Sequence, residues 1–154
     1  AVINGLAACK GAHKRFEYKG EFNGAKVYDD YGHHPTEVQA VAKSILNKKY
    51  NKSYVIFEPH TYSRVKNYYK EFAKSLISFD NIIITDIFAA RETNEFNVSP
   101  EDIINEIKKL SANAIHISDF DDIKEYLKNN VKENDLILTL GAGNVTKLSE
   151  ILTK

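Results

Sequence analysis

Short apolar runs alternate with longer amphipathic segments along this chain, and this alternation constrains the fold more than any other feature. Three runs have the β-rich, apolar character of buried strands, and they cover residues 53–57, 81–85 and 135–140. Such runs are typical of parallel strands that are covered on both faces. A shorter run covers residues 114–118. Residues 15–20 and 25–30 predict a hairpin across residues 21–24.

Helical periodicity fills the intervals between these runs. The clearest helix begins at Pro35, which suits a first-turn position. Its apolar face is predicted to contain Val38, Val41, Ala42, Ile45 and Leu46. Further helices are predicted at residues 64–78, 99–110, 119–130 and 144–152.

The order of these elements predicts a three-layer, Rossmann-like α/β domain. It has a mainly parallel sheet of about six strands, an antiparallel N-terminal hairpin, and helices on both faces. A chain of 154 residues is long enough for one such core. Ligands of these sheets bind beyond the carboxyl ends of the strands, so the residues that follow strands are the candidates for function.

Composition excludes several classes of protein. Lys and Arg number 21, as do Asp and Glu, so no net positive charge is available to hold nucleic acid. The single cysteine, Cys9, rules out an internal disulfide and fits a reducing compartment, so a cytoplasmic location is expected. No apolar run approaches the roughly 18 residues of a membrane span, and no basic segment precedes an apolar one as in an export signal.

Polar side chains crowd the segment DDYGHHPTE at residues 29–37, between the second predicted strand and the first long helix. Asp, His and a helix N-terminus can bind hydroxyl groups and anionic oxygens, so this segment is a candidate ligand site. A structural alternative is that Asp30 caps a turn and that His33 and His34 are ordinary turn residues. Metal binding by these histidines with His60 is a weaker alternative, because adjacent side chains diverge and no HxxxH or CxxC spacing occurs.

A second polar segment, PHTYSR at residues 59–64, follows the buried run at residues 53–57. It should therefore reach the same edge of the sheet as the first segment and face one pocket with it. Arg64 offers a planar guanidinium that can grip a carboxylate, the group that every amino acid presents. The structural alternative is a solvated arginine in the first turn of a helix, but a cation there opposes the helix dipole.

The residues alone allow two roles each for the segment GAGN and for Arg15. GAGN at residues 141–144 joins the last strand to the last helix, and its glycines suit either a phosphate loop or a tight turn. The chain contains no GxxxxGKS or GxxxxGKT and no complete GxGxxG, so no full nucleoside-triphosphate site is evident. Arg15 could pair with Asp29 and Asp30 if the hairpin forms, or could project toward a nucleotide.

With these residues in view, the chain resembles the C-terminal domain of the Mur ligases, and within that family the members that add L-alanine. Five motifs carry the resemblance, namely GAHKRFE, DDYGHHPTE, FEPHTYSR, DIFAARE and GAGN, at residues 11–17, 29–37, 57–64, 86–92 and 141–144. Murein peptide ligases share a similar aspartate–histidine segment, but PHTYSR favours the alanine-adding members. A non-catalytic nucleotide- or amino-acid-binding module is the alternative from another class.

The resemblance implies an ADP-forming, ATP-dependent ligase. It would activate the lactyl carboxylate of UDP-N-acetylmuramate as an acyl phosphate, which the amine of L-alanine attacks. In this family a central domain carries the phosphate loop, the magnesium ligands and a carbamylated lysine, and the first domain holds the UDP-sugar. ATP and Mg2+ are thus the expected cofactors, and both substrates and the enzyme's own other domains are the expected partners. The C-terminal domain closes over ATP and is expected to be inactive alone.

Carried over residue by residue, the resemblance assigns six positions. Arg15 and Asp30 match positions that contact the nucleotide. His33 matches a position at the reacting end of the site and is the candidate catalytic residue. The amino-acid pocket is matched by Tyr31, His60 and Arg64. These contacts would orient the amine rather than transfer protons.

This sequence departs from the family pattern at one position, and the resemblance implies a domain boundary. Thr61 stands where several relatives carry a second arginine, so carboxylate binding would depend more on Arg64. Residues 1–12 are expected to be a remnant of the connection to a missing central domain. Residues 13–154 are expected to form the C-terminal domain, which binds the amino acid and closes over ATP.

Overall fold

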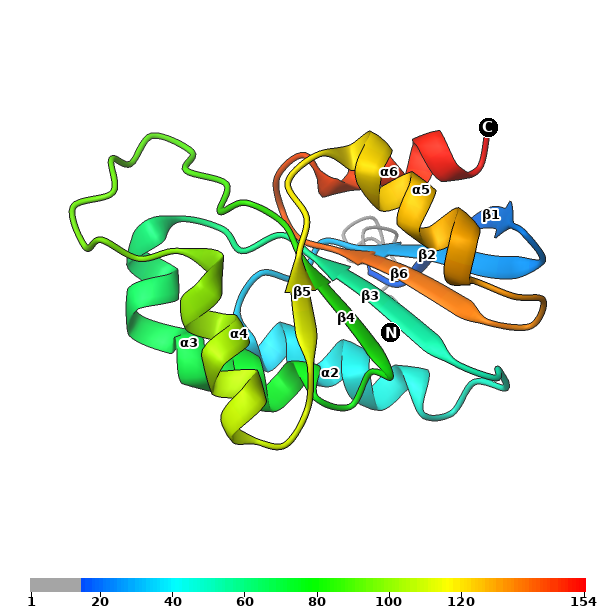
Figure 1. The fold of residues 1–154 in the computed structure, drawn as a ribbon, viewed down its shortest axis with the longest axis horizontal. Coiled ribbons are helices and arrows are strands. Elements are labelled where there is room, and N and C mark those ends of the chain that lie inside the picture. The colour runs from blue at the N-terminus through cyan, green and yellow to red at the C-terminus, as the bar shows by residue number, and fades with distance from the viewer. Residues whose placement is uncertain (1–14) are drawn as a thin grey trace, which may run out of the picture.

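The computed structural model describes residues 15–154, which form a sheet between two layers of helices (Figure 1). The strands are β1 (Glu17–Phe22), β2 (Ala25–Asp30), β3 (Ser53–Phe57), β4 (Asn81–Ile84), β5 (Ala114–His116) and β6 (Leu136–Leu140). The helices are α2 (Pro35–Ile45), α3 (Tyr62–Leu76), α4 (Pro100–Lys109), α5 (Phe120–Asn130) and α6 (Val145–Leu152). The expectation for residues 1–12 lies outside the described residues.

The six strands are ordered β1-β2-β6-β3-β4-β5. β1 is antiparallel to β2, and every other neighbouring pair is parallel. Helices α2, α3 and α4 lie on one side of the sheet, with α5 and α6 on the other (Figure 1). The predicted three-layer, mainly parallel architecture with an antiparallel hairpin is confirmed.

The central strands β3, β4 and β6 are mostly apolar because each one faces two hydrophobic cores. In β3, Val55 and Phe57 point into the core beneath α2, α3 and α4, whereas Tyr54 and Ile56 point into the core beneath α5 and α6. All five residues of β3 and of β6 are buried. This alternation explains why continuous apolar runs, rather than alternating ones, marked these strands in the sequence.

The starts of α2 and α4 agree with the sequence signals, whereas α3 begins at Tyr62 rather than at residue 64, and one predicted core residue is not buried. Pro35 and Pro100 are the first residues of α2 and α4, and Ser99 caps α4 through a capping box with Asp102. Leu46, however, is 63% exposed. The prediction that it lies on the buried face was wrong because α2 ends at Ile45, and Leu46 caps it from outside the apolar stripe.

The turn of the N-terminal hairpin is tighter than the pattern predicted. β1 continues through Glu21 and Phe22, so only Asn23 and Gly24 form the turn. Both have positive φ values, 53° and 82°, as the two central residues of a type I′ turn require. The prediction of residues 15–20 as the first strand was wrong at both ends: β1 begins at Glu17, and it continues to Phe22 because Asn-Gly supplies a two-residue connection.

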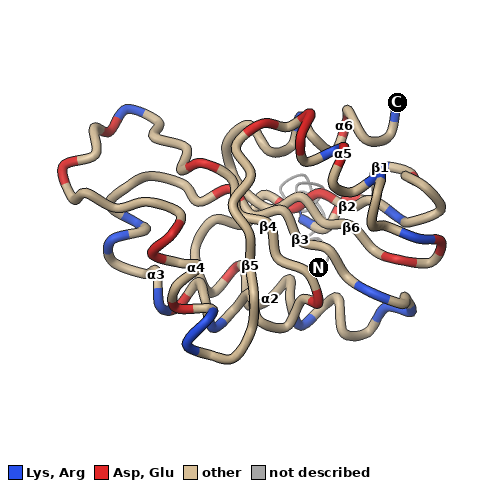
Figure 2. Tube along the Cα trace, in the orientation of Figure 1, with Lys and Arg blue, Asp and Glu red and all other residues tan. Residues whose placement is uncertain are grey.

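Charged residues of both signs are distributed over the helices and loops on both faces of the sheet (Figure 2). Within residues 15–154, no helix combines the length and the apolar content that crossing a membrane requires. The helices instead present one apolar stripe each to the sheet, as the buried residues of α3 and α4 show.

Gly24→Ala should destabilise the chain. An added Cβ would lie 3.0 Å from the Cα of Glu133, on backbone with a φ of +82°. We expect the free energy of unfolding to fall by about 1–3 kcal/mol. Asn23→Gly is the matched control, because glycine also accepts a positive φ. Urea unfolding followed by circular dichroism measures both, and wild-type stability of Gly24→Ala would refute the tight-turn constraint.

Candidate functional site

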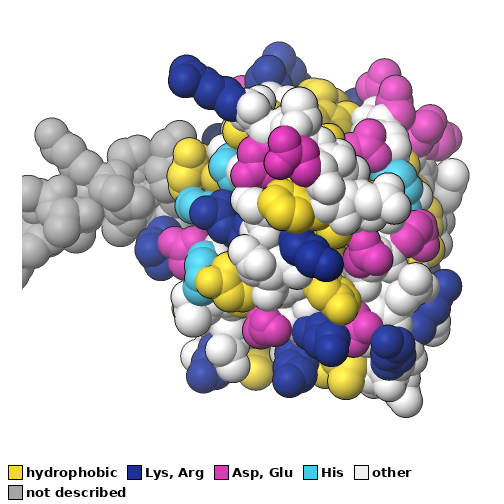
Figure 3. Space-filling view, turned by 90° about the vertical axis from the view of Figure 1, so that its left-hand side faces the viewer, with side chains coloured by type: hydrophobic (Ala, Val, Ile, Leu, Met, Phe, Trp, Pro, Cys, Tyr) yellow, Lys and Arg dark blue, Asp and Glu magenta, His cyan; other side chains and the backbone are white. Residues whose placement is uncertain are grey.

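The loops that follow β2, β3 and β6 leave the sheet side by side. Hydrogen bonds extend the parallel ladder past the strand ends, because Gly141 N donates to Asp30 O at 3.0 Å and Glu58 N donates to Leu140 O at 2.9 Å. Asp30, Glu58 and Gly141 therefore begin three loops at one edge. Figure 3 views the molecule from this side, where histidine side chains lie along the margin next to the grey residues and also near the opposite margin.

The Asp30 carboxylate binds backbone N–H groups of two segments, one just before β1 and one just after β2. Its carboxylate accepts from Phe16 N and from Gly32 N, both at 2.7 Å, and the residue is 1% exposed. Burial raises the pKa of Asp30, and the two backbone hydrogen bonds and the nearby Arg15 charge oppose that rise. The turn-capping alternative is thus observed. The carboxylate also fixes the backbone next to Arg15.

The carboxylates beside the hairpin do not pair with Arg15. Asp29 instead accepts from the hydroxyls of Thr139 and Thr146, at 2.6 and 2.9 Å. Arg15 Nη2 lies 3.4 Å from Glu37 Oε2, and the arginine side chain is 60% exposed. The pairing of Arg15 with Asp29 and Asp30 that the sequence suggested was therefore wrong, because Arg15 contacts Glu37 instead. The exposed guanidinium retains donors for a ligand.

His34 has a structural role at the start of α2. It is the N-cap of that helix, its ring accepting from Thr36 N, while Glu37 accepts from the backbone N–H groups of His33 and His34 at 3.1 and 3.0 Å. Burial alone would raise the pKa of Glu37, but these two N–H groups and the charges of His33 and Arg15 lower it. His34 therefore has the structural role given as the alternative, because its ring caps the start of α2.

The His33 ring lies beside that cap, with its Nδ1 3.6 Å from Glu37 Oε1, and it also meets the second polar segment. Its Nδ1 lies 3.1 Å from Tyr31 O, and its ring centroid lies 5.7 Å from that of Tyr31 and 5.4 Å from that of His60. Next in this row, Arg64 Nη1 lies 3.1 Å from His60 Nδ1. The predicted amino-acid residues and the predicted catalytic residue therefore form one continuous cluster, although β6 lies between the strands β2 and β3 that they follow.

The contact with Arg64 defines the protonation of His60. A guanidinium can only donate, so Nδ1 of His60 accepts and the ring proton lies on Nε2. Burial lowers the pKa of His60, as do the charges of His33 and Arg64, while Glu92 opposes them. His60 is therefore neutral at pH 7, and its ring orients Arg64 without repelling it.

Glu58 was missed by the sequence reading, although it directly follows a buried strand. It is 5% exposed, and its Oε1 accepts from Val145 N at 3.1 Å at the start of α6. Burial raises the pKa of Glu58, while backbone N–H groups of residues 143–145 oppose the rise. A Cβ on Gly143 would lie 2.5 Å from Glu58 Oε1. The backbone of the GAGN loop and the start of α6 thus surround an internal carboxylate.

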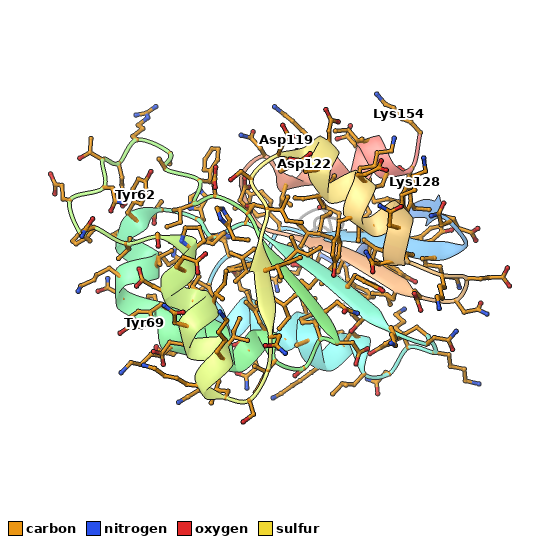
Figure 4. The ribbon with its side chains drawn as sticks, viewed as in Figure 1. Tyr62, Tyr69, Asp119, Asp122, Lys128 and Lys154 are labelled. Carbon is orange, nitrogen blue, oxygen red and sulfur yellow. The ribbon has the colours of Figure 1, made fainter. Side chains whose placement is uncertain are left out.

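A cavity of about 460 Å³ opens at the same edge, but it does not contain the predicted residues. Its lining includes Glu58, Asp86 and Asp119. Each has a protein partner: Asp86 accepts from His116 and Ser118, and Asp119 caps α5, at whose start Figure 4 shows it. No group of three His, Cys, Asp or Glu suited to a metal ion occurs within residues 15–154.

These features define a Rossmann-like α/β domain with a polar cluster at the carboxyl ends of its strands. The family model described as "Mur ligase, glutamate ligase domain" matches residues 14–143. The chain belongs to the Mur ligase family.

Individual relatives agree with this assignment. The chain is 44% identical to the UDP-N-acetylmuramate–L-alanine ligase of Clostridium botulinum, over 97% of this chain and 32% of that protein. It is 48% identical to the ligase of the same name from Caldanaerobacter subterraneus, over 92% of this chain and 31% of that protein. The chain therefore spans about a third of the length of these curated relatives.

Solved structures show the same fold. A UDP-N-acetylmuramate–alanine ligase from Thermotoga maritima superimposes with a TM-score of 0.69 at 25% identity, covering 91% of this chain and 29% of that one. A murein peptide ligase from Psychrobacter arcticus superimposes with a TM-score of 0.74 at 21% identity, covering 90% and 29%. The second likeness concerns the fold alone.

Replacing Glu58 should loosen the GAGN loop. Glu58→Ala leaves buried N–H groups of that loop without an acceptor, so we expect a loss of about 1–3 kcal/mol in the free energy of unfolding. Glu150→Ala, which removes an exposed carboxylate from the same helix that Glu58 caps, is the control. Chemical unfolding measures both, and equal stability of the two variants would contradict the role of Glu58.

The pH dependence of Glu58→Gln provides a second measure of the same contact. The pKa of Glu58 is raised in the folded state, so its contribution is present below the unfolded pKa and is lost as pH rises through the folded pKa. The stability of the wild type relative to Glu58→Gln should therefore fall as the pH rises from the ordinary pKa of a glutamate through the raised pKa of the folded state. A difference that stays constant across this range would count against a buried, ionising Glu58.

Proposed function

We propose that this chain is the C-terminal domain of an ADP-forming ligase that joins L-alanine to UDP-N-acetylmuramate. The support is its identity of 44–48% to ligases of that name, together with the cluster around Arg64. In the complete enzyme the first and central domains would bind the UDP-sugar and carry the phosphate loop. This domain would supply the amino-acid pocket and part of the ATP site.

The surroundings of the Arg64 side chain support its assignment to the amino-acid pocket. Its side chain is partly buried and bonded to a neutral His60, and no carboxylate of residues 15–154 lies within 4.0 Å of it. A partly desolvated cation gains free energy from an anionic partner, and a guanidinium binds a carboxylate through two parallel hydrogen bonds. We assign that partner as the carboxylate of L-alanine.

Tyr31, His33 and His60 would form the remainder of this pocket. His60 holds the guanidinium of Arg64, and Tyr31 places its ring against His33. We assign His33 to the reacting end, where it would orient the attacking amine toward the acyl phosphate. Positioning of this kind converts a bimolecular attack into an effectively intramolecular one, which is a large part of the rate enhancement in acyl transfer.

Arg15 and Asp30 would form the nucleotide side. The residues fit ATP in one respect, because Arg15 is exposed and makes a single long contact with Glu37, so its donors can reach a phosphate. Asp30 is nearly fully buried and holds Phe16 N, so it would place the backbone that carries Arg15. A Mur ligase family member from Thermotoga maritima has been solved with ADP. The Mg2+ ligands are assigned to the central domain.

Arg64→Ala and Arg15→Ala should affect different substrates of the complete ligase. Loss of Arg64 removes the cationic partner of the L-alanine carboxylate, so the KM for L-alanine should rise on the order of 100-fold while the KM for ATP changes little. Loss of Arg15 should raise the KM for ATP instead. Steady-state phosphate release with each substrate varied measures both, and equal effects of either variant on both substrates would sink the two assignments.

The 154-residue chain alone should be inactive. It contains no phosphate loop, and the proposed reaction needs groups from two further domains. Incubation with ATP, Mg2+, UDP-N-acetylmuramate and L-alanine should release no phosphate above the background without enzyme. The complete ligase is the positive control. ATP-dependent joining by the chain alone would overturn the assignment of a part that acts only within the whole enzyme.

A further inference from the structure

The loop between β4 and α4, residues 85–99, is attached to the proposed amino-acid pocket. Phe88 N donates to Pro59 O and Thr61 N donates to Phe88 O, both at 2.8 Å, so His60 and Phe88 form a parallel bridge outside the sheet. This loop projects beyond the start of α3, which Tyr62 marks in Figure 4. Residues 86–92 of this loop form the segment DIFAARE, to which the family resemblance assigns no role.

Phe88 holds the ring of His60. The two rings are stacked with centroids 5.4 Å apart and planes inclined by 22°, while His33 contacts His60 with a centroid distance of 5.4 Å. A Cβ on Gly143 would lie 2.6 Å from Phe88 Cγ, so the phenyl ring is confined between the GAGN loop and His60. His60 is thereby kept in the orientation in which its Nδ1 meets Arg64.

Glu92, from the same loop, holds the first turn of α3. Its carboxylate accepts from Ser63 N at 2.9 Å and from the hydroxyl of Ser63. α3 has no acidic residue of its own in the first turn, and Arg64 there opposes the helix dipole. Glu92 supplies the missing negative charge from outside the helix. The Ser63 hydroxyl and N–H lower the pKa of Glu92, so the group is ionised at neutral pH.

The strained residue in this turn is held by the same contacts. Thr61 has a φ of +67°, which is unfavourable for a β-branched residue. Its N–H is bonded to Phe88 O, and its hydroxyl accepts from Arg64 N at 3.3 Å. The loop therefore holds the backbone of Thr61 in this strained conformation, at the start of the turn that carries Arg64. Strained backbone persists only where surrounding contacts hold it.

We propose that Glu92 is a positioning residue for the amino-acid pocket, acting through Ser63 on the direction of the Arg64 guanidinium. Both carboxylate oxygens of Glu92 are engaged by Ser63, and neither lies within 4.0 Å of Arg64. Glu92 therefore balances the charge of Arg64 without occupying the donors that the substrate carboxylate needs. The inference rests on the proposed function of Arg64.

Kinetics of the complete ligase test this role. Glu92→Ala should raise the KM for L-alanine on the order of tenfold, with the KM for ATP unchanged within about twofold, because the guanidinium loses its direction and not its charge. Glu92→Gln keeps one acceptor and should restore part of the affinity. Glu95→Ala, in the same loop and without a side-chain hydrogen bond within residues 15–154, is the control and should match the wild type.

A double-mutant cycle identifies the route of the effect. If Glu92 acts through Ser63, then Ser63→Ala should raise the KM for L-alanine, and Ser63→Ala with Glu92→Ala should be no worse than Glu92→Ala alone. Additive effects, or equal rises in the KM for ATP, would overturn the proposal. Should Glu92→Ala fail to fold, Glu92→Gln and Ser63→Ala carry the same comparison.

The outcome is separable from that of the proposed function. If Arg64→Ala raises the KM for L-alanine and Glu92→Ala does not, only the role of Glu92 is wrong. If Arg64→Ala leaves the KM for L-alanine unchanged, the amino-acid pocket itself is misassigned, and the role of Glu92 falls with it.

Discussion

Parallel pairing of β6 with both β2 and β3 is the constraint on which the rest of the structure depends. It places Asp30, Glu58 and Gly141 at one edge of the sheet, although they come from distant parts of the chain. The same register divides the side chains of each strand between two cores. Because a shift of one residue would exchange the two faces, the apolar cores and the polar cluster are specified together.

Carboxylates that accept hydrogen bonds from backbone N–H groups hold this edge in shape. Asp30 fixes the turn before the histidines, Glu58 fixes the GAGN loop, and Glu92 fixes the start of α3. Burial raises the pKa of Asp30 and of Glu58, and backbone N–H groups oppose both shifts. His33 in its loop and Arg64 in the first turn of α3 are consequently presented by backbone that side-chain contacts already hold, which reduces the ordering that a ligand must impose.

Much of the fold could be predicted because its signals are local. Ser99 and Pro35 marked helix starts, and the continuous apolar runs marked strands covered on both faces. The errors lay at element ends: Leu46 continues the helical period beyond the last helical turn, and Glu21 is polar yet belongs to the half-exposed strand β1. Periodicity describes the middle of an element, while its end depends on turn geometry and capping.

The sequence by itself determined the order of strands and helices and the two polar segments, because both follow from residue type and spacing along a few turns of chain. Only the tertiary structure decided which side chains meet. Arg15 contacts Glu37 rather than Asp29 or Asp30, His34 caps a helix while its neighbour His33 meets His60, and a buried Glu58 fills the GAGN loop. These partners come from different strands and loops, and their pairing depends on strand register and side-chain direction, which no local pattern encodes.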